Sequence, residues 1–120
     1  YEGEYVKGLW QGVGVLKLEN GDYYRGDFLE GLRHGTGVYT FASGNLYEGQ
    51  FSDDKMHGEG IFTYANGDRY VGTFFEGLQN GPGVIEYSDG GHFEGTFKNG
   101  KRSGRGVMVY ANGDRIEGDF

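Results

Sequence analysis

Short segments in which aromatic and polar residues alternate begin every 23 residues along the chain. In the segment Tyr47–Phe51, Tyr, Gly and Phe occupy alternate positions, with Glu48 and Gln50 between them. This is the period of two expected for a β-strand with one polar face. A second segment, Gly60–Tyr64, is rich in β-branched and aromatic residues and predicts a second strand. Each unit therefore predicts a pair of strands, and no segment has the period of a helix.

Two different connections join these strands. The segment Ser52–Gly58 predicts a polar loop between the two strands of a unit. Asn66-Gly67 follows the second strand, and Asn-Gly between two strands is a strong hairpin signal because both residues tolerate positive φ. Each hairpin is therefore expected to turn directly into the next.

The length of the Asn-Gly turn decides the register of the sheet. A two-residue turn would pair Ile61 with Gly72, whereas a three-residue loop would pair Gly60 with Gly72. Because a one-residue slip moves side chains to the opposite face, the sequence leaves open which face Phe62 and Tyr64 share.

The unit recurs without insertion or deletion. The complete units are residues 1–23, 24–46, 47–69, 70–92 and 93–115, and a partial unit covers 116–120. A fixed period of this length indicates an array of small units, none of which can bury its apolar face alone. We therefore predict one all-β domain over residues 1–120, an antiparallel meander of about eleven short strands some 50 Å long. Since both ends fall within the pattern, we expect a segment of a longer array.

Composition and charge narrow the classes of partner. The chain carries 26 glycines, no cysteine and a formal net charge of −7. Most of the surface should therefore repel nucleic acid and anionic lipid, and neither disulfides nor thiolate metal sites are available. The fifth unit is the exception, and its basic residues form a candidate patch for an acidic partner or a phosphoinositide headgroup: Lys98, Lys101, Arg102, Arg105 and Arg115.

The candidate chemistry is sparse. His34 and His57 occupy the same position in adjacent units, but a zinc site normally needs three or four ligands and no third is evident. Glu2 and Glu4 flank a strand glycine, where their side chains are expected to lie on the solvated face. We therefore predict no metal, no cofactor and no enzymatic activity.

The strand glycines and the rings beside them predict how the apolar face is used. Each glycine leaves a gap, to be filled by a neighbouring ring or by a residue of the next strand. The candidate β-branched fillers are Val15, Val38, Ile61, Val84 and Val107. Since no second layer is encoded, the rings should be partly exposed or covered by a partner, because exposed apolar patches mark partner surfaces; packing within the sheet is the alternative. The partner-binding candidates are Tyr24, Phe28, Tyr47, Phe51, Tyr70, Phe74, Phe93 and Phe97.

These motifs closely resemble the MORN (membrane occupation and recognition nexus) repeat. The third unit carries Tyr-Glu-Gly-Gln-Phe, Met-His-Gly-Glu-Gly and Ile-Phe-Thr-Tyr-Ala-Asn-Gly-Asp, and residues 31–37 are nearer still to the family's Gly-Lys-Arg-His-Gly-x-Gly stretch. The resemblance covers all 120 residues. It implies a single-layer, twisted antiparallel sheet, elongated and with a groove along one side.

The resemblance also implies a scaffold or adaptor function. MORN proteins often act at cytoskeletal structures near membranes, and some form dimers. We therefore expect a cytoplasmic, cytoskeleton-associated and membrane-proximal scaffold that binds protein partners through an aromatic groove and forms a homodimer, and that does not bind nucleic acid. The alternatives are a phosphoinositide-binding module with peripheral membrane contact, or a regulatory segment of a larger enzyme.

Overall fold

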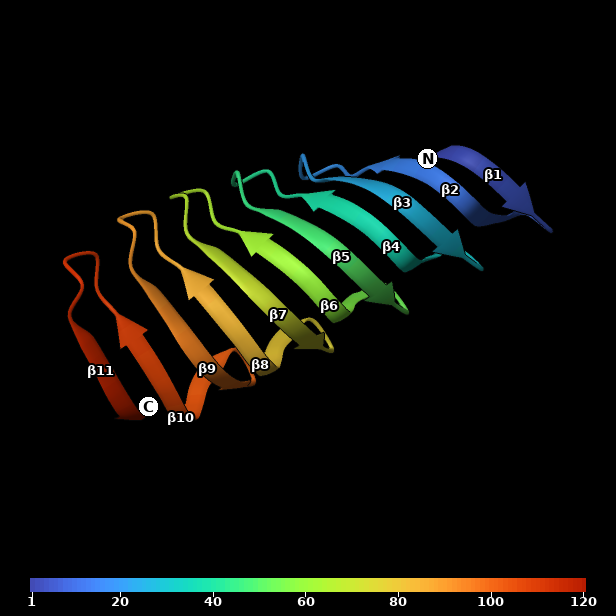
Figure 1. Ribbon diagram of the computed structural model, residues 1–120. Helices are drawn as coiled ribbons and strands as arrows, with labels where there is room; N and C mark the ends of the chain where they lie inside the picture. The colour runs from blue at the N-terminus through green and yellow to red at the C-terminus, as the bar shows by residue number, and fades with distance from the viewer.

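The computed structural model describes residues 1–120 as a single antiparallel sheet of eleven strands in chain order (Figure 1). The strands are β1 (Glu2–Val6), β2 (Leu9–Lys17), β3 (Tyr23–Leu29), β4 (Leu32–Thr40), β5 (Leu46–Ser52), β6 (Lys55–Thr63), β7 (Arg69–Phe75), β8 (Leu78–Glu86), β9 (His92–Lys98), β10 (Lys101–Val109) and β11 (Arg115–Asp119). The sheet is open, curved and 55 Å long. The predicted all-β, single-layer array is confirmed, and the structure contains no helix that could cross a membrane.

Two kinds of turn alternate along the two long edges of the sheet. We call the turns at 7–8, 30–31, 53–54, 76–77 and 99–100 the tip turns, and the loops at 19–21, 42–44, 65–67, 88–90 and 111–113 the base turns. Lys7 and Gly8 have φ of 52° and 79° between the paired residues Val6 and Leu9, the pattern of a two-residue type I′ turn. The predicted polar loop at Ser52–Gly58 is therefore wrong, because strands continue up to the two turn residues.

The base turns hold three residues rather than two. The Tyr64 N–H donates to the Asp68 carbonyl at 2.8 Å, and the Gly67 N–H donates to the Tyr64 carbonyl at 2.9 Å. Only Gly67 of this loop has positive φ, 96°. The three-residue alternative is therefore the correct one, and Asn66 does not need the left-handed conformation that a two-residue turn would require.

This loop length sets the faces of the sheet. Gly60 pairs with Gly72, and Phe62 pairs with both Tyr47 and Tyr70. Phe62 consequently shares the ring-bearing face, which we call the inner face. Ile61 pairs with Glu48 and Val71 on the opposite, outer face. The expectation that Val15, Val38, Ile61, Val84 and Val107 fill the gaps between rings is therefore wrong.

A β-bulge in each second strand bends the sheet toward the inner face. In β6 it begins at Gly58, with φ of 83°, and leaves the Glu59 N–H without a strand partner. The Gln50 side-chain oxygen accepts this N–H at 2.8 Å. In β8 the same position is Pro82, which has no N–H to satisfy, and the facing Thr73 hydroxyl donates instead to the Asn80 carbonyl. A proline is tolerated here because the bulge has already removed its ladder bond.

Candidate partner-binding groove

The eight rings predicted to bind a partner are buried by the chain itself. Tyr24, Tyr47, Tyr70 and Phe93 have no exposed area, and Phe28, Phe51, Phe74 and Phe97 are also buried. The expectation that these rings are exposed or need a partner to cover them is wrong. They form the core of the molecule, although it has only one layer.

Edge-to-face stacking and the strand glycines explain this burial. The Tyr47 ring lies over the Gly49–Gly60 pair, so closely that a Cβ on Gly60 would come within 2.5 Å of it. Its centroid is 5.1 Å from those of Phe51 and Phe74, in both cases edge to face. The same contacts recur from unit to unit and produce a continuous zigzag of rings. The prediction that a ring fills the gap beside each strand glycine is confirmed.

The buried hydroxyl groups of this stack are satisfied locally. The Tyr47 hydroxyl donates to the Gln50 carbonyl at 2.7 Å, and Tyr24 and Tyr70 make the same bond to the residue three positions on. Burial raises the pKa of Tyr47 and of Tyr70 to about 12. Phe93 occupies this position in the fifth unit and cannot make the bond.

Other side chains therefore form the accessible part of the inner face. They come from three positions of each unit that the sequence alone did not assign to a face. The first row follows the tip turns: Trp10, Arg33, Met56, Gln79 and Arg102. The second row lies across from the buried stack: Leu16, Tyr39, Phe62, Ile85 and Met108. The third row precedes the base turns: Leu18, Phe41, Tyr64, Tyr87 and Tyr110. Most are half-buried and pack against the ring stack. Their 23-residue period is the signal that identifies them once the register is known.

These rows enclose a groove, which we call the inner groove. Phe51 and Phe74 form part of its floor, and two pockets of about 250 and 200 Å³ follow one another along it. The first lies between Arg33 and Met56, beside Tyr39 and Phe41. The second lies between Met56 and Gln79, beside Phe62 and Tyr64.

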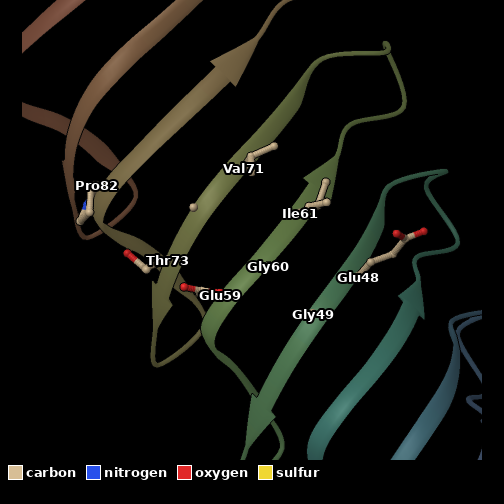
Figure 2. Close-up of a pocket in the computed structure, with 9 residues that line it drawn as sticks. Glu48, Gly49, Glu59, Gly60, Ile61, Val71, Thr73 and Pro82 are labelled. Carbon is tan, nitrogen blue, oxygen red and sulfur yellow. The ribbon is translucent and has the colours of Figure 1, made fainter.

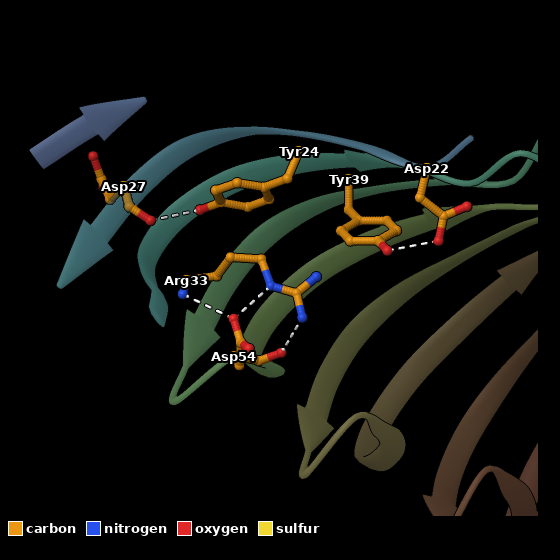
Figure 3. Close-up of polar contacts among 6 residues, drawn as sticks. All are labelled: Asp22, Tyr24, Asp27, Arg33, Tyr39 and Asp54. Atoms are coloured by element: carbon orange, nitrogen blue, oxygen red, sulfur yellow. Dashed lines mark hydrogen bonds and ion pairs between the residues drawn. The ribbon is translucent and has the colours of Figure 1, made fainter. Parts of the chain in front are cut away.

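Arg33 links two units on the inner face. Its guanidinium lies 4.9 Å from the centroid of the Tyr39 ring and also covers Tyr24 and Phe51. Nε donates to Asp54 Oδ1 at 2.8 Å, and Nη2 donates to the Asp54 carbonyl at 2.8 Å (Figure 3). Asp54 stands where the other tip turns have glycine and has φ of 74°. Asp54 is thus a less favourable turn residue than glycine, but its side chain and carbonyl hold Arg33 in place.

Carboxylates and amides link the base turns of neighbouring units. Asp22 accepts the Tyr39 hydroxyl at 2.6 Å (Figure 3) and the Ala42 N–H at 2.8 Å. These two bonds lower the pKa of Asp22. Asn45 and Asp68 accept the corresponding N–H groups of the following turns. The fourth unit has Gly91 at this position, so the link to the fifth unit is missing.

The structure does not bring the five basic candidates together. Lys98 and Lys101 face each other across the last tip turn. Arg102 lies instead over the Phe93 ring, on the inner face. Arg115 lies at the opposite long edge of the sheet, beside the last base turn, where it contacts the Glu117 carboxylate, and Arg105 pairs with the acidic Asp119.

The outer face has a broad depression, but its charged groups do not point toward a common centre. Figure 2 shows it over the backbone of Gly49 and Gly60, with Ile61 and Val71 at one side. Its volume is about 530 Å³, and its charged groups, Glu48 and Glu59, are exposed. Nowhere in the structure do three His, Asp or Glu side chains approach one another closely enough to hold a metal ion.

The fold defines a β-hairpin repeat protein, and comparison with known families identifies which one. The MORN repeat model matches residues 1–23, 24–46, 47–69, 70–92 and 93–115. The chain therefore belongs to the MORN repeat family, whose members are generally non-enzymatic binding modules. No curated protein sequence matches it significantly.

A solved structure shares the fold. It is the TCP domain of SAS-4 (dCPAP) of Drosophila melanogaster in complex with a proline-rich motif of Ana2 (dSTIL). The TM-score is 0.52 at 16% sequence identity, over 88% of this chain. This chain spans 65% of the length of that solved chain, and at this identity the likeness concerns the fold alone.

Proposed function

We propose that this protein is a non-enzymatic scaffold or adaptor that binds protein partners along the inner groove. The observation that carries the proposal is the set of half-buried aromatic side chains in the second and third rows, including Phe41, Phe62 and Tyr64, beside the two pockets. Partly exposed aromatic residues are enriched in protein interfaces. The buried ring stack lies beneath this surface, so a partner would contact the residues of the three rows and not the buried rings.

Two comparisons support a protein partner. Membership of the MORN family makes an interaction or membrane-associated module the expected class. The solved TCP domain with the same fold was determined with a peptide motif bound, which indicates that an open sheet of this kind is able to hold a peptide. Homodimer formation, and a cytoplasmic location at a cytoskeletal or membrane-proximal structure, belong to the same proposal.

Selection from a displayed library of random peptides tests the proposal. Peptides enriched on the native protein should lose binding to Phe41→Ala and Tyr64→Ala. They should bind normally to Phe75→Ala, since Phe75 is an aromatic residue 55% exposed at the end of β7 and outside the inner groove. If no enriched peptide depends on Phe41 or Tyr64, the groove is not the binding surface. Substitution of Phe51 or Phe74 would not test binding, because it removes part of the core and would destabilise the sheet.

Phosphoinositide binding rests on a narrower observation, the adjacent pair Lys98 and Lys101 at the last tip turn. Each basic group near an anionic surface contributes about 1 kcal/mol. Co-sedimentation with phosphoinositide-containing vesicles, compared between the native chain and Lys98→Glu/Lys101→Glu, tests it. Binding that is unchanged by this double substitution would remove the pair from consideration.

A further inference from the structure

The pockets of the inner groove recur at the period of the repeat. Met56 forms a wall of both pockets, between Arg33 of the preceding unit and Gln79 of the next. Equivalent residues are two strands apart, and neighbouring strands are separated by about 4.8 Å. The pockets are therefore about 9.6 Å apart along the sheet axis.

We propose that the inner groove binds a proline-rich segment in the polyproline II conformation, with lysine or arginine beside its prolines. This inference rests on the proposed function and specifies its ligand. Three residues of polyproline II advance about 9.3 Å and return to the same side of the chain, so every third residue would meet one pocket. Same-side residues of a β-strand recur after about 6.8 Å, which does not match the pockets.

An α-helix matches this period less closely and is wider than an extended chain. Seven helical residues advance about 10.5 Å, yet a helix with its side chains is about 10–12 Å across. The inner groove is bridged beside each pocket, by Arg33 4.9 Å from the Tyr39 ring and by Gln79 Nε2 donating to the Tyr64 hydroxyl at 2.9 Å. A helix would have to break both bridges. A polyproline II chain can place its intervening residues over them.

The lining supplies the contacts that such a chain needs. Polyproline II has no internal hydrogen bonds, so its carbonyl groups need donors, and its rings fit aromatic-lined pockets. The Tyr64 hydroxyl accepts the Gln79 amide, which leaves its own proton free to donate. Arg33 is held by Asp54 through Nε and Nη2, and its side chain lines the first pocket.

The charges along the two rims favour a basic ligand. The cations beside the first pocket are already paired, Arg33 with Asp54 and Lys55 with Glu76, whereas Lys98 and Lys101 lie without an acidic partner at the tip turn beyond the second pocket. Acidic groups without a basic partner remain on both rims: Glu30 and Asp53 at the tip turns, and Asp22, Asp68 and Asp89 at the base turns. Complementary charge at the rim of an interface directs partner choice and the rate of association.

Fluorescence anisotropy with three labelled 12-residue peptides tests the inference. The first is four repeats of Arg-Pro-Pro, the second four repeats of Arg-Gly-Ser, and the third a helix-forming Leu/Lys peptide of equal charge. We expect the proline peptide to bind at least 10-fold more tightly than the Arg-Gly-Ser peptide. Phe41→Ala and Tyr64→Ala should each weaken it at least 10-fold, Tyr64→Phe several-fold, and Phe75→Ala not at all. Circular dichroism of each variant verifies that the sheet is intact.

Each other outcome overturns the inference. Equal binding of the two arginine peptides would mean that charge alone acts, and failure of the proline peptide to bind would exclude it as the ligand class. Preference for the helical peptide, abolished by Phe41→Ala and Tyr64→Ala, would leave the proposed function standing and remove polyproline II. The proposed function itself fails only if the library also yields no ligand that depends on these two residues.

Discussion

A single hydroxyl distinguishes the first four ring positions from the fifth. The Tyr47 hydroxyl donates to the Gln50 carbonyl at 2.7 Å, and Phe93 in the fifth unit leaves the Thr96 carbonyl without this donor. Tyr47→Phe should lower the free energy of unfolding by about 1 kcal/mol, because a buried hydrogen bond is lost. Phe93→Tyr should raise it by up to about 1 kcal/mol for the same reason.

Urea unfolding of both variants measures the effect, with Tyr110→Phe as the control because Tyr110 is exposed. If Tyr47→Phe has no larger effect than Tyr110→Phe, the hydroxyl–carbonyl bond does not contribute to stability.

The same tyrosines make stability depend on alkaline pH. An unfolded tyrosine loses its proton near pH 10, whereas burial raises the pKa of Tyr47 and Tyr70 to about 12. Deprotonation therefore favours the unfolded chain, so the contribution is complete below pH 10 and is lost between pH 10 and 12. The urea midpoint should fall from pH 9 to pH 11, and it should fall less in Tyr47→Phe/Tyr70→Phe. Equal slopes in the two proteins would contradict this assignment.

At the scale of one strand, the stability of each bulge depends on one side chain that accepts the N–H left without a strand partner. Gln50 accepts the Glu59 N–H in β6, and Asp27 does the same for Thr36 in β4. Gln50→Leu should cost about 1 kcal/mol because this N–H loses its partner. Gln50→Asp should retain most of the stability, since the second unit already uses a carboxylate. Thermal unfolding compares the two, and equal losses would show that the side-chain acceptor does not stabilise the bulge.

Local sequence rules predicted the strands of each hairpin but not the types of turn that join them. The strands and their order follow from alternation and period alone. The turn types do not, because Asn-Gly favours a two-residue turn while the observed base turn needs positive φ only at Gly67. Conversely, Lys7, Glu30 and Glu76 begin type I′ turns although neither lysine nor glutamate favours positive φ. Strand pairing on both sides imposes these conformations, which local propensity cannot reveal.

At the scale of the whole molecule, the prediction failed on burial. The sequence indicated the rings and the glycines beside them, and it indicated that no second layer exists. It did not indicate that a tyrosine over two glycines, with phenylalanine edges on both sides, is closed to solvent within one curved layer. That result needs the register, which places Gly49 beside Gly60, and the bulge, which bends the sheet. The partner surface that we propose is therefore formed by Phe41, Tyr64 and their equivalents, and not by the buried rings.

Because each unit contacts only its neighbours, damage to the core should stay local. The Phe74 ring contacts the rings of Tyr47 and Tyr70, so Phe74→Ala should cost about 3–5 kcal/mol in the third and fourth units. In hydrogen exchange, amides of β6, β7 and β8 should lose protection while those of β1 and β2 keep theirs. Phe75→Ala on the same strand is the matched control, since its exposed ring lies outside the stack. A uniform loss of protection from β1 to β11 would mean that the array unfolds as one cooperative body.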